Sequence, residues 1–135
     1  IIVMANGEKV PPAAMESAIG LDPLVDQVLV LGEGQHQLAA LAVVEPETFA
    51  GLMREFDMDP EDDETRTDRF VEKLVLKRIN GRLLDFPGYA QIRRVKILTE
   101  PWTIEDGLMT PTQKLKRTLI EKQHAEDIAE LFAGR

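Results

Sequence analysis

The sequence predicts a small α+β domain, in which a short N-terminal hairpin and a central antiparallel hairpin form a small sheet that packs against about four helices. Two runs rich in aliphatic and β-branched residues, at 25–31 and 38–44, flank a turn that contains glycine. Apolar residues at helical spacing recur before and after these runs. A length of 135 residues, of which 44% are hydrophobic, suffices for one core. We therefore treat residues 1–135 as a single domain.

At the N-terminus a tight turn should precede the first helix. Asn6-Gly7 is a frequent pair in hairpin turns. Two prolines at positions 11 and 12 suit the start of a helix, and Gly20 supplies a natural stop, so we expect a helix that ends near position 19. Its buried face would be formed by Met15, Ala18 and Ile19.

The central hairpin should be followed by a short helix. The turn Gly32-Glu33-Gly34 joins the two β-rich runs, which predicts an antiparallel pair with a loop of several residues. After it, apolar residues at helical spacing predict a short amphipathic helix over one face of the sheet. These residues are Phe49, Leu52, Met53 and Phe56.

An acidic run at about 57–68 interrupts the pattern. Close like charges repel one another, so we expect a solvated, mobile loop. The run lacks the glycine turn and the terminal glutamate spacing of an EF-hand loop, so it does not predict a metal site. Its acids are Asp57, Asp59, Glu61, Asp62, Asp63, Glu64 and Asp68.

A longer helix, a third strand and a final helix should complete the domain. The longer helix would end before Pro87-Gly88, and the strand would span 92–98. The inward residues of the longer helix would be Phe70, Val71, Leu74, Val75, Ile79 and Leu83. Those of the final helix would be Leu115, Leu119, Ile128, Leu131 and Phe132.

The expected start of the final helix places cations where helix physics prefers acids. Thr110 and Gln113 have capping-box spacing, and a proline between them suits the first helical position. Lys114 and the basic residues after it would then lie at the positive end of the helix dipole, where each exposed cation costs about 0.3–1 kcal/mol. They would either be solvated surface cations or meet a counter-charge outside the helix.

Composition excludes several classes of function. A net charge of −8 argues against a nucleic-acid partner, because such proteins carry a basic face. The sequence has no cysteine, one serine and two histidines, which excludes a thiolate zinc site and makes a serine triad improbable. It also has no phosphate-binding glycine loop. No run approaches the roughly 20 apolar residues of a membrane span. The absence of cysteine fits a cytoplasmic protein, which is what we expect.

The segment 106–117, with the sequence Asp-Gly-Leu-Met-Thr-Pro-Thr-Gln-Lys-Leu-Lys-Arg, resembles the C-terminal signature of AMP-forming acyl-CoA synthetases. These enzymes belong to the adenylate-forming superfamily, and the form seen in this chain is most similar to the long-chain fatty-acid branch. Most of the superfamily has glycine just before the signature lysine, where this chain has Gln113. The resemblance places the signature lysine at Lys114, with Lys116 as a second candidate.

Residues 1–16 resemble the strand, glycine turn, strand and helix that follow the hinge between the large and small domains of these enzymes. The hinge residue of the family, an Asp or Lys just before this strand, is absent. We therefore expect the chain to begin just past the hinge and to be a piece of a longer protein. An N-terminal adenylation domain would be its partner, and the isolated piece would be inactive.

The resemblance implies the C-terminal domain of a long-chain fatty-acid:CoA ligase, which uses ATP, Mg²⁺ and CoA to turn a fatty acid into acyl-CoA through an acyl-adenylate. It gives the catalytic role to Lys114 and places Gly7, Glu8 and Lys116 near the substrate or CoA. It implies no metal ligand in this chain. The full-length enzyme would have no membrane span, although peripheral membrane association stays open.

Two rival interpretations remain. The first is an adenylation domain that loads the phosphopantetheine of a carrier protein, as in carboxylic acid reductases. The second is a non-catalytic interaction module. Strand alternation would also place Arg94 and Lys96 on one face, where they either meet CoA phosphates or are simply solvated. For Trp102, the only tryptophan, core packing or a lid over the domain interface is expected rather than ligand stacking.

Overall fold

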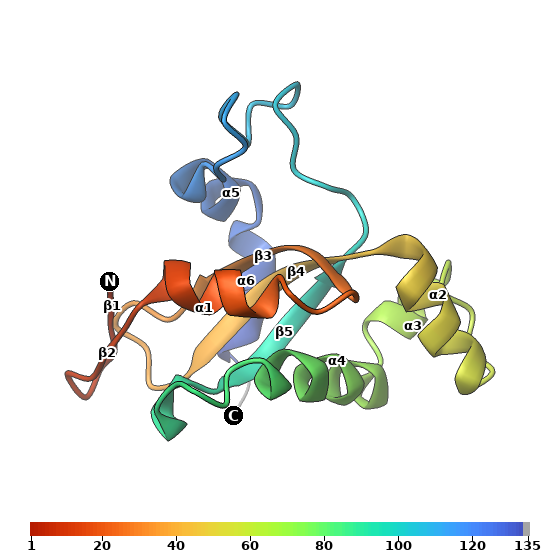
Figure 1. Ribbon diagram of the computed structural model, residues 1–135, viewed down its shortest axis with the longest axis horizontal. Coiled ribbons are helices and arrows are strands. Elements are labelled where there is room, and N and C mark those ends of the chain that lie inside the picture. Colours follow the sequence, from red (N-terminus) through yellow and green to blue (C-terminus); the bar gives the residue numbers. More distant parts are fainter. Residues whose placement is uncertain (134–135) are drawn as a thin grey trace.

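The structure is a computed structural model that describes residues 1–133. Strands β1 (Ile2–Val3) and β2 (Lys9–Val10) form an antiparallel N-terminal hairpin. A second sheet has the order β3-β4-β5, in which β3 (Val25–Leu31) pairs antiparallel with β4 (Leu38–Val44) and β4 pairs parallel with β5 (Ile92–Leu98). The predicted α+β class, with an N-terminal hairpin and a central hairpin, is confirmed (Figure 1).

The described residues form six α-helices rather than about four. The helices are α1 (Pro12–Ile19), α2 (Pro46–Glu55), α3 (Asp63–Arg66), α4 (Arg69–Gly81), α5 (Arg117–Gln123) and α6 (Ala125–Ala133), and a 3-10 turn spans Gly88–Ala90. The two additional helices arise because one turn of helix forms in the acidic run and because the expected final helix is broken at His124. No helix among residues 1–133 is long and apolar enough to cross a bilayer.

Acidic side chains in the run 57–68 cap helices. Asp62 accepts a hydrogen bond from the Glu64 N–H at the start of α3. Asp68 accepts from the N–H groups of Phe70 and Val71 at the start of α4. Caps of this kind satisfy backbone donors that a helix start leaves free. Part of the acidic run therefore has a local structural role.

The three-stranded sheet separates two hydrophobic clusters. Every residue of the central strand β4 is buried. In Figure 1, α1 and α4 lie in front of the sheet and α6 lies behind it. The front cluster includes Met15, Ile19, Val28, Val30, Phe49, Met53, Val71, Val75 and Ile79, and the rear cluster includes Leu29, Leu31, Leu41, Trp102, Ile120 and Leu131.

Three of the residues predicted to face inward are exposed: Phe56, Phe70 and Leu119. Phe56 is 42% exposed because α2 ends at Glu55, one residue before it. Phe70 is 46% exposed, because at the first turn of α4 its ring packs edge-on against Phe56 at the surface, with centroids 5.0 Å apart. Leu119 is also 46% exposed. The last helices begin at Arg117 and break at His124, so the apolar stripe passes through Ile120 instead.

On each edge strand of the sheet, one backbone N–H donates a hydrogen bond to a carboxylate from a helix. Glu16 of α1 accepts from the Val30 N–H of β3 at 2.7 Å. Glu72 of α4 accepts from the Val95 N–H of β5 at 3.0 Å. Each carboxylate also binds an arginine. Backbone donors at free sheet edges are thereby satisfied, and the two helices are tied to opposite edges.

Candidate functional site

Lys114 directly follows a hairpin loop and does not lie in a helix. The Thr110 N–H donates to the Lys114 carbonyl at 2.8 Å, and the Gln113 N–H donates to the Thr110 carbonyl at 2.7 Å. Met109 and Leu115 form a bridge below this turn. Gln113 has φ +64°. This pattern is that of a three-residue hairpin loop whose last residue is left-handed.

The predicted helix start at Thr110 is therefore wrong. The Thr110 hydroxyl accepts from the Lys114 N–H at 3.0 Å rather than from Gln113 as a capping box requires. A proline that suits the first helical position equally suits the second position of a turn, and the turn forms. Helix α5 begins at Arg117 with Lys116 as its N-cap.

The interpretation based on the helix dipole changes accordingly. Lys114 precedes the helix, so the dipole gives its charge no particular cost. Arg117 does lie at the helix start, and its counter-charge is inside this chain, because the Glu16 carboxylate accepts from Arg117 Nη2 at 2.6 Å. No local pattern predicts this pairing, because the two residues lie 101 positions apart.

The Lys114 side chain is exposed, and no hydrogen bond or ion pair joins its ammonium to another described residue. Lys114 lines an open groove of about 760 Å³ between the hairpin loop, α1 and the start of β3. Two acids, Glu16 and Asp26, share this groove. Partial desolvation and the neighbouring Glu45 carboxylate raise the pKa of Asp26, although much of that residue stays exposed.

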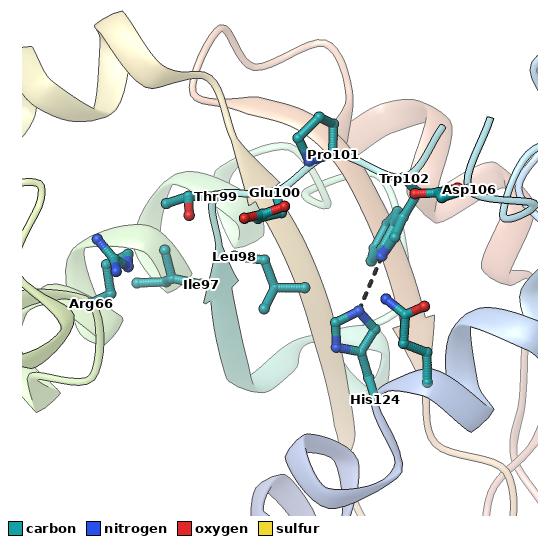
Figure 2. A pocket seen from close by; sticks show the side chains of 10 residues that line it. Arg66, Ile97, Leu98, Thr99, Glu100, Pro101, Trp102, Asp106 and His124 are labelled. Carbon is teal, nitrogen blue, oxygen red and sulfur yellow. Dashed lines mark hydrogen bonds between the residues drawn. The ribbon is translucent and has the colours of Figure 1, made fainter. Parts of the chain in front are cut away.

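The segment between β5 and α5 leaves the sheet and forms the loops at the top of Figure 1. Trp102 is 2% exposed and packs in the rear cluster, as the core-packing interpretation expected. Its indole N–H donates to His124 Nε2 at 3.1 Å, and His124 Nδ1 lies 3.0 Å from Asp127 Oδ2. Figure 2 shows the indole facing the imidazole beside a cavity of about 340 Å³.

Gly7 and Glu8 lie at the β1–β2 turn and are not among the residues that line the Lys114 groove. Gly7 has φ +88°, and a Cβ atom there would meet nothing within 4 Å, so the backbone is open to close approach. Glu8 Oε1 accepts from the Asn6 amide at 2.8 Å. Its Oε2 atom is buried and has no hydrogen-bond partner within residues 1–133.

Lys116 is exposed and also lies outside the groove. None of the three predicted substrate-binding residues therefore lines the groove beside Lys114. Across the described residues, no three His, Asp or Glu side chains are grouped so that they could hold a metal ion.

Arg94 and Lys96 share a face of β5, as predicted, because they lie opposite Ala39 and Leu41 in an unbroken stretch of the β4–β5 register. Arg94 pairs with Glu72 of α4, at 2.8 Å, and Lys96 with Asp127 of α6, at 3.5 Å. Because β5 is an edge strand, the long Arg94 side chain can reach α4 around the edge of the sheet, while Lys96 meets α6. The register shift in the β4–β5 pairing lies before Arg94, opposite Leu38 and Ala39, and leaves the alternation from Arg94 to Lys96 unbroken. Both cations already have partners within the domain.

Sequence reasoning missed Gln27, which binds the start of the Lys114 segment. Its side-chain amide donates to the Trp102 carbonyl and accepts from the Trp102 N–H, each at 2.8 Å. It lies at a bulge of β3 and is partly buried. A polar amide, next to Asp26 in a strand whose other residues are all apolar, was the available signal.

The whole chain, residues 1–135, matches a family model described as the AMP-binding enzyme C-terminal domain. The chain is 31% identical over 137 residues to the long-chain-fatty-acid–CoA ligase FadD15 of Mycobacterium tuberculosis, which covers 98% of this chain and 22% of that protein. It is 29% identical over 133 residues to the probable chloroplastic acyl-activating enzyme 16 of Arabidopsis thaliana, which covers 97% of this chain and 18% of that protein.

A solved structure is similar as well. The A domain of the carboxylic acid reductase of Segniliparus rugosus, in complex with AMP and a co-purified carboxylic acid, matches with a TM-score of 0.79 at 25% identity, over 98% of this chain and 19% of that one. This chain thus spans about a fifth of the length of each of these proteins. The resemblance seen in the sequence is confirmed: the chain belongs to the family of AMP-binding enzyme C-terminal domains, and its relatives include long-chain fatty-acid–CoA ligases.

Proposed function

We propose that this chain is the C-terminal domain of a long-chain fatty-acid:CoA ligase, which activates a fatty acid with ATP to acyl-AMP and then transfers the acyl group to CoA. The observation that carries the proposal is Lys114, an exposed ammonium with no partner among the described residues, at the edge of an open groove. An N-terminal adenylation domain of the same chain would hold Mg²⁺ and most of ATP. Without that domain, this chain would be inactive.

The chemistry of carboxylate activation suits such a lysine. Attack of a carboxylate on the α-phosphate of ATP brings two anions together and builds further negative charge at phosphorus. An ammonium on a flexible stem would screen the anions from each other and stabilise the developing charge. Loss of one such group costs on the order of 10²–10³ in rate. Thioester formation lacks this clash of anions and would not need the lysine equally.

The second half-reaction would use another surface of the domain. Gly7 lies at an open turn, where the backbone leaves room for a slender pantetheine arm. Glu8 and Lys116 are further proposed contacts for CoA. Because these residues lie outside the Lys114 groove, the proposal requires the domain to present different faces to the active site in the two steps.

The test separates the two half-reactions in the complete enzyme. We expect Lys114→Ala to lower ATP–pyrophosphate exchange by about 10²–10³, while thioester formation from preformed acyl-adenylate changes little. Lys116→Ala is the matched control for the exchange step, because Lys116 is also exposed and lies two residues away; as a proposed CoA contact, it is not a control for thioester formation. If Lys116→Ala alone abolishes exchange, the signature lysine is Lys116. If neither variant affects exchange, the assignment fails and a non-catalytic interaction module becomes the better interpretation.

The similarity to a carboxylic acid reductase A domain supports an alternative acceptor for the acyl group in the second half-reaction. In that case the acyl group would pass to the phosphopantetheine of a carrier protein instead of to CoA. Preformed acyl-adenylate offered with CoA or with a phosphopantetheinylated carrier protein distinguishes the two. We expect faster thioester formation with CoA, and a preference for the carrier protein would favour the alternative.

A further inference from the structure

We propose that Gln27 and Glu16 are positioning residues that fix the two ends of the segment carrying Lys114. This inference rests on the proposed role of Lys114 in adenylation. The segment between β5 and α5 contains neither helix nor named strand, so side chains from elsewhere in the fold must set its path. Two do so, one from β3 and one from α1.

Gln27 anchors the start of the segment through the backbone of Trp102. The amide of Gln27 donates to the Trp102 carbonyl and accepts from the Trp102 N–H, so one side chain replaces the pairing of a neighbouring strand. The same Nε2 group lies 3.3 Å from Met109 Sδ, just before the hairpin loop. Only an amide offers a donor and an acceptor side by side, so glutamate and methionine cannot reproduce both bonds.

Glu16 anchors the end of the segment through Arg117, three residues after Lys114. Both carboxylate oxygens of Glu16 accept from Arg117 Nη2 at 2.6 Å, and Arg117 Nη1 donates to the Val30 carbonyl at 3.0 Å. Because Glu16 also accepts from the Val30 N–H, α1, β3 and the first residue of α5 are joined in one network. Charge-assisted bonds of this kind have well-defined geometry.

Between these anchors, the position of the Lys114 ammonium depends on the backbone alone. Its side chain has no partner among residues 1–133 that would hold it. The hairpin loop itself is closed by the bonds between Thr110 and Lys114. If either anchor is lost, the loop can shift as a unit, and a displacement of about 1 Å at a reacting centre can cost on the order of 10²-fold in rate.

A matched control exists at the opposite edge of the sheet. Glu72 of α4 accepts from Arg94 Nε at 2.8 Å and from the Val95 N–H at 3.0 Å. It therefore makes the same kind of contact as Glu16, a helix carboxylate that binds an arginine and an edge-strand N–H. None of its partners belongs to the segment that carries Lys114. A purely structural effect of losing such a carboxylate should appear equally in Glu72→Gln.

The first test measures the two half-reactions in the complete enzyme for Glu16→Gln, Gln27→Glu, Gln27→Met and Glu72→Gln. We expect the Glu16 and Gln27 variants to lower kcat of adenylation by about 10-fold or more, with thioester formation from preformed acyl-adenylate within about twofold of the parent enzyme. Glu72→Gln should leave both steps unchanged. Equal losses in both steps, or an equal loss in Glu72→Gln, would overturn the positioning role.

The second test probes the opening of the segment that carries Lys114 without measuring enzyme activity. Trypsin cleaves after Lys114 and Lys116 only when this segment opens, and mass spectrometry of the complete enzyme identifies both cuts. We expect cleavage there to accelerate in the Glu16 and Gln27 variants and not in Glu72→Gln; unchanged cleavage would contradict the anchoring. If neither Lys114→Ala nor Lys116→Ala lowers pyrophosphate exchange, the proposed function fails, whereas the proteolysis result still decides whether the two residues anchor the loop.

Discussion

At the scale of single residues, the backbone of Gln113 explains a feature of the lysine segment. Gln113 has φ +64° at the last position of the hairpin loop. A side chain in this region is strained by roughly 1–2 kcal/mol, whereas glycine adopts it freely. The family resembled by this sequence mostly has glycine just before its lysine, and the geometry of the loop gives the physical reason. Gln113 therefore keeps the loop conformation at an energetic cost.

Substitution of Gln113 should reveal that cost. We expect Gln113→Gly to raise the free energy of unfolding by up to about 1 kcal/mol and Gln113→Val to lower it by about 1–2 kcal/mol, because a β-branched residue tolerates positive φ least. Urea unfolding measures both. The control is Gln91→Gly, since Gln91 has φ −74° and gains nothing from glycine. Stabilisation by both glycine variants would show that backbone strain at Gln113 is not the cause.

At the scale of elements, Asp22 joins the end of α1 to α4. Its side chain is 4% exposed and accepts from Arg78 at 2.7 Å and from Arg82 at 3.3 Å. Its Oδ1 atom also accepts from the Leu24 N–H at 2.9 Å. Burial opposes ionisation, but the hydrogen bonds from Arg78 and Leu24, the charge of Arg78 and the bond from Arg82 outweigh it and lower the pKa of Asp22 below its usual value of 3.8.

This pKa shift predicts the pH dependence of stability. A lowered pKa in the folded state means that the contribution of Asp22 is complete above its usual value and is lost as pH falls through the folded value. We expect Asp22→Asn to lower the free energy of unfolding by about 1–3 kcal/mol at neutral pH. The difference from the parent protein should shrink below about pH 4.

Urea titrations at a series of pH values test this prediction, with Asp85→Asn as the control. Asp85 is exposed, so its substitution should change stability by less than about 0.5 kcal/mol. A difference for Asp22→Asn that stays constant from neutral pH to well below pH 4 would contradict the assigned ionisation.

Elements whose signal is local could be predicted from the sequence. The three strands of the larger sheet and α1, α2 and α4 follow periodicity, prolines and glycines, and their predicted positions hold to within a few residues. The start of the last helix failed because proline favours both the first turn of a helix and the second position of a β-turn. The local sequence does not distinguish a helix start from a β-turn. The bridge between Met109 and Leu115 favours the turn.

The candidate site could be predicted only in part. Lys114 is found from its resemblance to a family motif, and whether it is catalytic stays a prediction. Its surroundings depend on contacts between distant residues, such as Gln27 with Trp102 and Glu16 with Arg117, which lie 75 and 101 positions apart. No local periodicity encodes these pairs. Strand alternation did place Arg94 and Lys96 on one face, but it could not show that their partners would be Glu72 and Asp127 of this domain.

At the scale of the whole molecule, the two faces of the sheet are unequal. The front cluster draws side chains from α1, α2 and α4, whereas the rear cluster rests on Trp102 and two short helices. Those helices have seven and nine residues and are separated at His124. Isolated helices of this length are marginal, so their stability depends on packing against the sheet. The smaller apolar area behind the sheet should therefore make this layer the weaker one.

Hydrogen exchange should show this difference. We expect amides of α4 to exchange only through global unfolding, and amides of α5 and α6 to exchange through a smaller opening with a lower free energy and a weaker denaturant dependence. Trp102→Phe should widen the gap, because it removes the indole hydrogen bond to His124 and part of the rear cluster. In this variant, the amides of α4 should still exchange only through global unfolding. If α4, α5 and α6 instead share one free energy of exchange and one denaturant slope, the sheet and both its layers open as a single unit. In that case the hairpin loop before Lys114, which precedes α5, opens only when the whole domain unfolds.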